Sequence, residues 1–245
     1  MNKKMRVCAI IPARYASVRL PAKPLADIKG KPMVQHVYER ACRAKLVDKV
    51  IVATDDNRIA DAVLSFGGDA VLTSPEHSTG TDRIAEAASL FDCEYALNVQ
   101  GDEPLIEPAL IDKMVEALLH DSSVVMATPI TPMKNPHEIE NPNVVKVVTD
   151  LNGNAIYFSR SPIPFVRDKS EENTIQMYKH IGLYGYRKDF LLQLVKWPQS
   201  SLEKAEKLEQ LRVLENGYPI KTVVGDYDGI SVDTPNDLME VLKRI

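Results

Sequence analysis

Three cationic side chains follow the first apolar run of the chain, within eleven residues that contain no acid. The run, 7–11, is rich in β-branched residues and predicts a buried strand that ends at Pro12. Ligands of open α/β folds bind at the carboxyl ends of such strands. The loop is therefore placed to hold a polyanion, and the alternative is a solvated basic loop. Its cations are Arg14, Arg19 and Lys23.

Two carboxylates stand after other apolar runs. Asp102 lies in Q-G-D-E-P after the run 95–99, and Asp233 follows the run 230–232. Mg²⁺ usually takes one or two protein carboxylates together with phosphate oxygens and water. Asp102 could instead cap a turn, and Asp233 could be the N-cap of the helix that Thr-Pro opens. Beside the basic loop, the two carboxylates predict chemistry on a Mg²⁺–nucleoside triphosphate at one sheet edge.

The familiar phosphate-binding motifs are absent from the sequence. It has no G-x-G-x-x-G, and Gly30-Lys31 is followed by Pro32 and lacks the upstream Gly of a Walker A loop. A bound nucleotide must therefore be held by side chains and backbone N–H groups of the basic loop. The segment S-T-G-T-D-R, 78–83, offers hydroxyls and a guanidinium that could read a base edge, although composition alone equally fits a surface turn.

The apolar pattern predicts an α/β protein. In the first half, predicted strands alternate with predicted helices, which is typical of a parallel sheet. The strands are expected at 7–11, 50–54, 70–73 and 95–99, and the helices at 32–41, 58–66, 84–91 and 108–119. The second half predicts strands at 123–128, 144–149, 155–159, 180–186, 220–224 and 230–232, and helices at 201–216 and from 235 onward. Asn152-Gly153 is a strong hairpin signal, so an antiparallel element is inserted into the parallel pattern.

Composition excludes several classes of protein. The 245 residues are 44% hydrophobic and 26% charged, as in soluble globular proteins, and the net charge of −4 argues against general nucleic-acid binding. No apolar run approaches the ~18 residues of a membrane-spanning helix. The apolar run after the basic start is too short for a secretory signal, so we expect a cytoplasmic protein. The three cysteines are widely spaced and have no zinc-ligand spacing.

Taken in order, the motifs resemble the 3-deoxy-D-manno-octulosonate (Kdo) cytidylyltransferases, also called CMP-Kdo synthetases. They are I-I-P-A-R-Y-A-S-V-R-L-P-A-K-P-L, V-A-T-D, S-T-G-T-D-R, N-V-Q-G-D-E-P, Y-F-S-R-S-P-I-P, K-H-I-G-L-Y-G-Y-R, L-E-Q-L-R-V-L-E-N-G and V-D-T-P-N-D. The resemblance covers nearly the whole chain. CMP-sialate synthetases share I-P-A-R but not the continuation L-P-x-K-P-L, nor Q-G-D-E-P and L-E-Q-L-R.

The resemblance implies an activity and a fold. The activity is Mg²⁺-dependent transfer of CMP from CTP to Kdo with release of pyrophosphate, which supplies activated Kdo for lipopolysaccharide. The fold is a three-layer Rossmann-like nucleotide-diphospho-sugar transferase fold, mostly parallel, with an inserted antiparallel subdomain at about 124–190 in a single domain, 1–245. The inserted segment would bind sugar and form a homodimer.

The resemblance also assigns site residues. The triphosphate would be held by Arg14, Arg19 and Lys23, which together with Asp102 and Asp233 would be catalytic. Mg²⁺ would be held by Asp102 and Asp233. CTP would further contact Pro12, Ala13, Ser78, Gly80, Arg83 and Gln100. The sugar acid would be surrounded by Gln100, Arg160, His180, Tyr184, Glu209 and Gln210, with Arg160 paired to its carboxylate. Ala22 stands where the family usually has Gly, which matters only if that position needs a positive φ.

Other functions are kept as alternatives. The enzyme could use a related acid sugar such as 8-amino-Kdo. A glycosyltransferase of similar fold would release a nucleoside diphosphate rather than pyrophosphate. A non-catalytic nucleotide-binding module would bind CTP but would not need Asp102 or Asp233.

Overall fold

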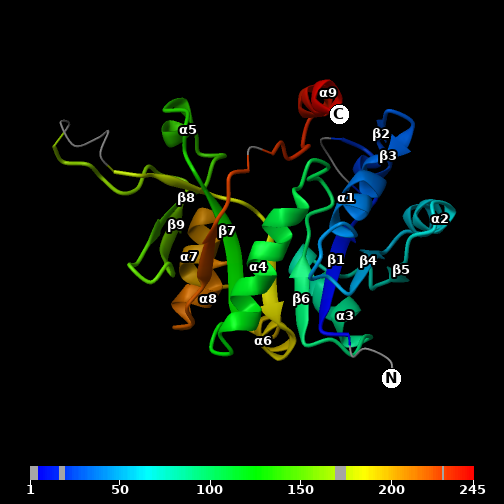
Figure 1. The fold of residues 1–245 in the computed structure, drawn as a ribbon, viewed down its shortest axis with the longest axis horizontal. Coiled ribbons are helices and arrows are strands. Elements are labelled where there is room, and N and C mark those ends of the chain that lie inside the picture. The colour runs from blue at the N-terminus through cyan, green and yellow to red at the C-terminus, as the bar shows by residue number, and fades with distance from the viewer. Residues whose placement is uncertain (1–4, 17–19, 169–174, 228) are drawn as a thin grey trace.

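A parallel sheet forms the first half of the protein. The computed structural model describes residues 5–16, 20–168, 175–227 and 229–245. Within them, the parallel strands lie side by side in the order β5 (Ala70–Leu72), β4 (Lys49–Thr54), β1 (Val7–Ala13) and β6 (Tyr95–Asn98) (Figure 1). In β1, Cys8 lies opposite Lys49 of β4 and Ala96 of β6. The strands predicted for this half are thus confirmed.

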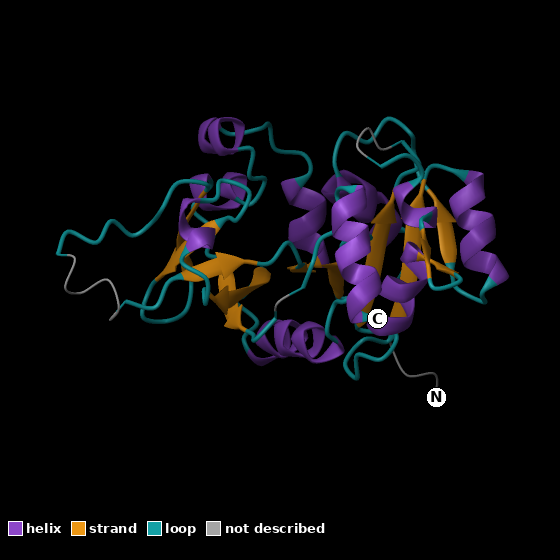
Figure 2. Cartoon of the chain, turned by 90° about the horizontal axis from the view of Figure 1, so that it is seen from above, coloured by secondary structure: helices purple, strands orange, loops and turns teal. Residues whose placement is uncertain are grey.

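Helices cover both faces of these strands, as Figure 2 shows from above. Along β1, Ala9 and Ile11 join one core with side chains of α1 and α4, whereas Cys8 and Ile10 join another core with side chains of α3. This alternation is the period of a strand that is buried on both faces. The three-layer architecture is therefore confirmed. The helices of this half are α1 (Met33–Ala41), α2 (Asn57–Ser65), α3 (Gly80–Ser89) and α4 (Pro108–His120).

The second half adds antiparallel strands to the same sheet. β11 (Tyr184–Arg187) joins β6 to β7 (Met126–Pro132), and β10 (Tyr178–His180) joins β7 to the hairpin of β8 (Lys146–Thr149) and β9 (Ala155–Ser159). β12 (Lys221–Val224) pairs with β7 in parallel. A bridge between Asn154 and Lys221 brings the hairpin to β12, so these strands curl away from the parallel part (Figure 2). The hairpin predicted at Asn152-Gly153 is confirmed.

The remaining elements are short, except for the last helix. They are η1 (Lys23–Leu25), β2 (Asp27–Ile28), β3 (Lys31–Pro32), α5 (His137–Glu140), α6 (Lys188–Leu194), α7 (Ser201–Glu206), α8 (Leu211–Glu215) and α9 (Pro235–Arg244). Among the described residues, no helix is long and apolar enough to cross a membrane.

Four local predictions were wrong. The single strand predicted at 180–186 is interrupted, because His180 ends β10 and Tyr184 begins β11. The helix predicted at 201–216 is interrupted, because Lys207 adopts a left-handed conformation with φ 54° and ends α7. Residues 230–232 do not form a strand; the N–H of Val232 instead donates to the carbonyl of Asp102 at 2.9 Å. The helix predicted from 84 begins at Gly80, because Thr79 caps it.

Ala22 also adopts a left-handed conformation, with φ 53° and ψ 31°, directly before η1. An L-residue with a Cβ pays a steric penalty of about 1–2 kcal/mol in this region, whereas Gly does not. The departure from Gly at this position therefore affects the backbone that leads into Lys23.

We expect Ala22→Gly to raise the free energy of unfolding by about 0.5–1 kcal/mol, because relief of strain exceeds the added entropy of the unfolded chain. Ala26→Gly is the matched control, because Ala26 has φ −56° and gains no relief. Chemical denaturation of the three proteins measures the effect. A loss of stability in Ala22→Gly equal to that in Ala26→Gly would contradict the strain.

Candidate active site

A cavity of about 450 Å³ opens at the carboxyl ends of β1 and β6. Its walls come from the end of β1, η1, the start of α3, the turn after β6 and the segment before α9. They are lined by Pro12, Ala13, Arg14, Lys23, Pro24, His77, Ser78, Thr79, Gly80, Arg83, Gln100, Gly101, Asp102 and Asp233. Every residue that the sequence assigned to CTP or Mg²⁺ is in this set except Arg19, which lies outside the described residues.

The turn after β6 fits closely against the basic loop. A Cβ placed on Gly101 would lie 2.8 Å from the carbonyl oxygen of Pro12, which is closer than such atoms approach in proteins. Only Gly allows the Q-G-D-E-P turn to pack against the end of β1 at this distance. Asp102 is consequently held beside the phosphate-binding candidates.

Lys23 lies between the two predicted metal ligands. Its Nζ donates to Oδ2 of Asp102 at 2.6 Å and to Oδ1 of Asp233 at 2.9 Å. Burial alone would lower the pKa of Lys23, but Asp102 and then Asp233 outweigh burial and raise it above its ordinary value. The three residues are far apart in sequence and meet at one point of the sheet edge.

Asp233 is not the N-cap of the last helix. The N-cap of α9 is Thr234, which forms a capping box with Asp237. The backbone bond from Val232 to Asp102 aligns the preceding segment with the turn after β6. This arrangement directs the carboxylate of Asp233 to Lys23 and removes the structural alternative that the sequence left open.

A second anchor fixes the start of the basic loop. The guanidinium of Arg58 lies 3.3 Å from the centroid of the Tyr15 ring, a cation–π contact. Asp56 accepts from two nitrogens of the same guanidinium, at 2.9 and 2.6 Å. The residue next to Arg14 is thereby tied to the beginning of α2.

The start of α3 forms the wall that faces the basic loop. Thr79 and Asp82 form a capping box, with Oγ1 of Thr79 accepting from the N–H of Asp82 at 3.1 Å. Arg83, one turn further, is buried, and its guanidinium donates to Oγ1 of Thr73 at 2.6 Å and pairs with Asp55 at 3.3 Å. A buried guanidinium held on two sides has one fixed direction, which suits recognition of a planar ligand. Sequence reasoning missed Asp55, which resembled an ordinary turn residue.

The residues predicted for the sugar acid, apart from Gln100 and Arg160, form an adjacent cluster. Glu209 accepts from Oγ1 of Thr81 on α3 at 2.6 Å, and Gln210 accepts from the hydroxyl of Tyr184 at 3.1 Å. The rings of His180 and Tyr184 are 5.3 Å apart. The break at Lys207 makes this cluster, because Glu209 and Gln210 then lie between two short helices rather than on one continuous helix.

Arg160 has a different environment. Its side chain donates to the carbonyls of Glu206 at 2.7 Å and Pro142 at 2.9 Å. It thus joins the β9 end to the segment that ends α7. The guanidinium donates to backbone carbonyls in the structure, and the pairing of Arg160 with a sugar carboxylate stays a prediction.

Burial sets the protonation of the cluster. Removal from water lowers the pKa of His180 to about 3, so its ring is neutral near pH 7. The ring contacts Oγ1 of Thr128 at 2.9 Å. Burial also raises the pKa of Glu209, although hydrogen bonds from Thr81 and Thr79 oppose this. The cluster therefore offers neutral hydrogen-bonding groups beside one carboxylate.

The sequence did not assign two further pairs of side chains to the site. His77 lines the cavity and pairs with Glu86 of α3. Glu103, next to Asp102, accepts from the Tyr227 hydroxyl at 2.8 Å, and burial raises its pKa to about 7. Glu103 was visible in Q-G-D-E-P, whereas no pattern in the sequence indicated Tyr227.

Fold and site define a class of protein. It is an α/β protein with a cavity at the sheet edge that is lined by side-chain cations and carboxylates rather than by a Gly-rich loop. A family model described as cytidylyltransferase matches residues 8–223. The class is therefore that of the cytidylyltransferases.

Named relatives narrow this class. A 3-deoxy-manno-octulosonate cytidylyltransferase of Geotalea uraniireducens is 59% identical and covers 98% of this chain and 99% of its own length. The 3-deoxy-manno-octulosonate cytidylyltransferase of Geobacter sulfurreducens is 56% identical, and the match covers 98% of this chain and 100% of that relative. The chain belongs to the 3-deoxy-manno-octulosonate cytidylyltransferase family, as the sequence motifs predicted.

Two solved structures share the fold of this chain. A structure described as CMP:2-keto-3-deoxy-manno-octonic acid synthetase complexed with CTP has a TM-score of 0.93 at 43% identity, covering 98% of both chains. A 4-diphosphocytidyl-2C-methyl-D-erythritol synthase of Anaerococcus prevotii has a TM-score of 0.64 at 15% identity, covering 99% of both chains, a likeness of fold alone. The predicted fold class is confirmed.

The neutral state of His180 predicts a pH dependence of stability. The unfolded residue gains a proton near pH 6.5, but the folded one only near pH 3. The unfolded state thus binds more protons between these values, so stability present above pH 6.5 is lost as the pH falls. When the pH falls from about 7.5 to about 5, the free energy of unfolding of the wild type should decrease by up to about 2 kcal/mol more than that of His180→Gln.

Guanidinium denaturation at both pH values measures the difference. The exposed His137, replaced by Gln, is the matched control and should behave like the wild type. Identical pH dependence in the wild type and His180→Gln would show that His180 is not held neutral.

Proposed function

We propose that this chain transfers CMP from CTP to Kdo and releases pyrophosphate. The observation that carries the proposal is the convergence of Lys23, Asp102 and Asp233 at one cavity, which places cations and carboxylates where a triphosphate and a metal ion would meet. Members of the family are named for this cytidylyltransferase activity, and a similar structure is described as complexed with CTP. The chemistry of the cavity fits both.

Mg²⁺ is the metal that suits the donor set. Asp102 and Asp233 converge on one cation position. Across the described ranges, no group of three or more His, Cys, Asp and Glu side chains could hold a metal. Two carboxylates, completed by phosphate oxygens and water, are the set that Mg²⁺ accepts. When bound there, the metal would neutralise charge on the phosphates and polarise their oxygens.

The protein side chains position the reacting groups. Arg14 and Lys23 would bind the β- and γ-phosphates and stabilise the pyrophosphate as it leaves, and Arg19 is proposed for the same role from outside the described residues. The anomeric hydroxyl of Kdo would attack the α-phosphorus opposite the leaving group. Positioning and charge neutralisation dominate such transfers.

Ser78, Gly80 and Arg83 are proposed to face the cytosine and ribose. Gly80 begins α3 and Ser78 directly precedes its N-cap, Thr79, which positions the N–H groups of the first turn. Arg83 is buried and fixed by Thr73 and Asp55. Pro12, Ala13 and Gln100 complete the proposed nucleotide contacts in the same cavity.

Kdo is proposed to bind between this cavity and the adjacent cluster of His180, Tyr184, Glu209 and Gln210, with Gln100 and Arg160. The Nε2 of Gln210 supports this placement, because it is buried and has no hydrogen-bond partner among the described residues. A buried amide donor without an acceptor is costly unless a ligand or water satisfies it. Hydroxyls of a sugar acid are suitable acceptors. The alternative, 8-amino-Kdo, is not favoured.

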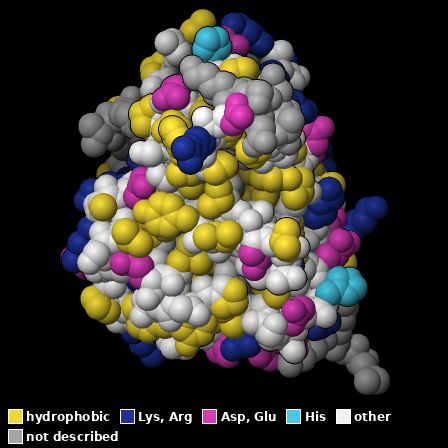
Figure 3. All heavy atoms as spheres, turned by 90° about the vertical axis from the view of Figure 1, so that its left-hand side faces the viewer, with side chains coloured by type: hydrophobic (Ala, Val, Ile, Leu, Met, Phe, Trp, Pro, Cys, Tyr) yellow, Lys and Arg dark blue, Asp and Glu magenta, His cyan; other side chains and the backbone are white. Residues whose placement is uncertain are grey.

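We also propose a homodimer that uses the inserted strands. Figure 3 shows the end of the molecule that carries them, where hydrophobic side chains gather over a broad area. Large apolar side chains are exposed on and near the hairpin: Leu151 at 107%, Ile156 at 60% and Phe165 at 88%. Burying such an area against a second copy would be favourable. A cytoplasmic location remains a prediction from the sequence.

Pyrophosphate release with CTP, Mg²⁺ and Kdo tests the function, with ATP, GTP and UTP as controls. Release that requires both CTP and Kdo is expected. Formation of a nucleoside diphosphate, or no release, would contradict the proposal.

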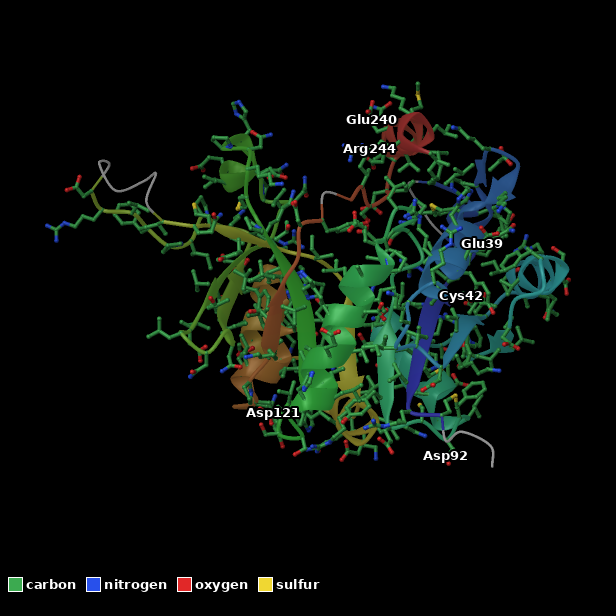
Figure 4. The ribbon with its side chains drawn as sticks, in the orientation of Figure 1. Glu39, Cys42, Asp92, Asp121, Glu240 and Arg244 are labelled. Carbon is green, nitrogen blue, oxygen red and sulfur yellow. The ribbon has the colours of Figure 1, made fainter. Side chains whose placement is uncertain are left out.

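We expect Asp102→Asn to lower kcat at least about a hundredfold without unfolding the protein, because it removes a proposed metal ligand. Asp92→Asn is the control. Asp92 is exposed and lies at the opposite end of the molecule from α9, as labelled in Figure 4. Turnover by Asp102→Asn at the wild-type rate would exclude the metal role, and circular dichroism checks the fold.

The dimer predicts the effect of one surface charge. Ile156→Asp should give a monomer in sedimentation or light scattering, because a carboxylate would be buried in the apolar interface. Leu64→Asp, on α2 and 61% exposed, is the matched control and should keep the wild-type mass. An unchanged mass for Ile156→Asp would place any interface elsewhere.

A further inference from the structure

The ammonium of Lys23 lies where the proposed metal ion would bind. It is within hydrogen-bond distance of both carboxylates, at 2.6 and 2.9 Å, and its side chain is 16% exposed. We propose that Lys23 is the counterion of Asp102 and Asp233 in the nucleotide-free protein, so that Lys23 and a divalent cation exclude each other until a triphosphate draws the ammonium away. This inference rests on the proposed function and adds how that site is regulated.

The local charges favour a cation at this point. Asp102 and Asp233 both approach the same position, and their side chains are 23% and 39% exposed, so water screens their repulsion only in part. Glu103 adds another acidic group next to Asp102. The ammonium of Lys23 offsets this repulsion. A divalent cation that enters the nucleotide-free site must therefore displace an ion pair that is already formed.

The other cations of the cavity differ in their contacts. Arg83 is held by Thr73 and Asp55, away from the carboxylate pair. Arg14 is exposed on the loop that follows β1. Among these three cationic side chains, Lys23 is the one that bonds to both proposed metal ligands.

A triphosphate changes the balance between these partners. It brings several negative charges into the cavity that Lys23 lines, and a lysine side chain has a flexible four-carbon stem that lets its ammonium change partners. Once the ammonium contacts phosphate, both carboxylates can face the metal that accompanies the nucleotide. Nucleotide and metal then raise each other's affinity by the same factor, as linkage requires. The nucleotide-free protein keeps a weak metal site.

The experiment measures Mn²⁺ binding to nucleotide-free protein from the electron paramagnetic resonance signal of free Mn²⁺. Lys23→Met should bind Mn²⁺ about tenfold or more tightly than the wild type, because the competing ammonium is gone. Lys23→Arg keeps a cation and should bind as weakly as the wild type. Arg14→Met is the matched control, since it removes an equal charge from the same cavity but leaves Lys23 in place.

Two more variants complete the design. The double variant Lys23→Met with Asp102→Asn should lose the gain, which would place the bound Mn²⁺ at these carboxylates. Lys23→Gln replaces Lys23→Met if the latter does not fold, and the same tighter binding is expected.

Mn²⁺ affinity that is unchanged or lower without Lys23 would overturn the proposal. An equal rise in Arg14→Met would also overturn it, because the effect would then be one of general charge. These titrations contain neither CTP nor Kdo. A failure of the exchange is thus distinguishable from a failure of the proposed function, which pyrophosphate release by the wild type decides separately.

Discussion

Two carboxylates that approach one point of a sheet edge repel each other, and a cation between them offsets the repulsion. Lys23 supplies that cation, with its Nζ between Asp102 and Asp233. Three segments bring these residues together. β1 leads to the basic loop that contains Lys23, and β6 leads to the turn that contains Asp102. The backbone bond from Val232 to Asp102 holds the segment before α9, with Asp233, at the same sheet edge. In the proposed function, a triphosphate and a metal ion would bind at the same position, so the ion cluster would also be the place of the chemistry.

Close packing keeps this edge in place. The contact of Gly101 with Pro12 leaves no room for a side chain, and the stack of Arg58 on Tyr15 fixes the other side of the loop. The left-handed Ala22 shows that the backbone accepts strain to place Lys23. Strain of this kind is commonly stored at functional sites, where the surrounding structure overrides local preference.

The sugar side of the site depends on a second irregularity. Leu208, Leu211 and Leu214 follow a helical pattern, so the sequence predicted one helix at 201–216. The left-handed Lys207 interrupts this helix. Nearby in the fold, the buried Lys146 donates to the carbonyls of Asn141 and Val144 and to that of Arg160. The bond from Arg160 to the carbonyl of Glu206, 46 residues away, joins the end of α7 to β9, and Gln210 accepts from the hydroxyl of Tyr184; no local pattern encodes either contact. Arg160, predicted to bind a carboxylate, belongs to the same framework.

The sequence by itself determined the alternating α/β elements, the hairpin at Asn152-Gly153 and, through the family resemblance, most of the residues that line the cavity, because apolar periodicity, turn chemistry and ordered motifs are local properties. It also left Asp102 and Asp233 each with a structural alternative. Only the tertiary structure decided that Thr234 caps α9, that Asp233 reaches Lys23, and that Asp55, Glu86 and Tyr227 support the site. The reason is physical: these contacts join segments up to 210 residues apart, and their energy depends on distances that the chain acquires only when the sheet forms.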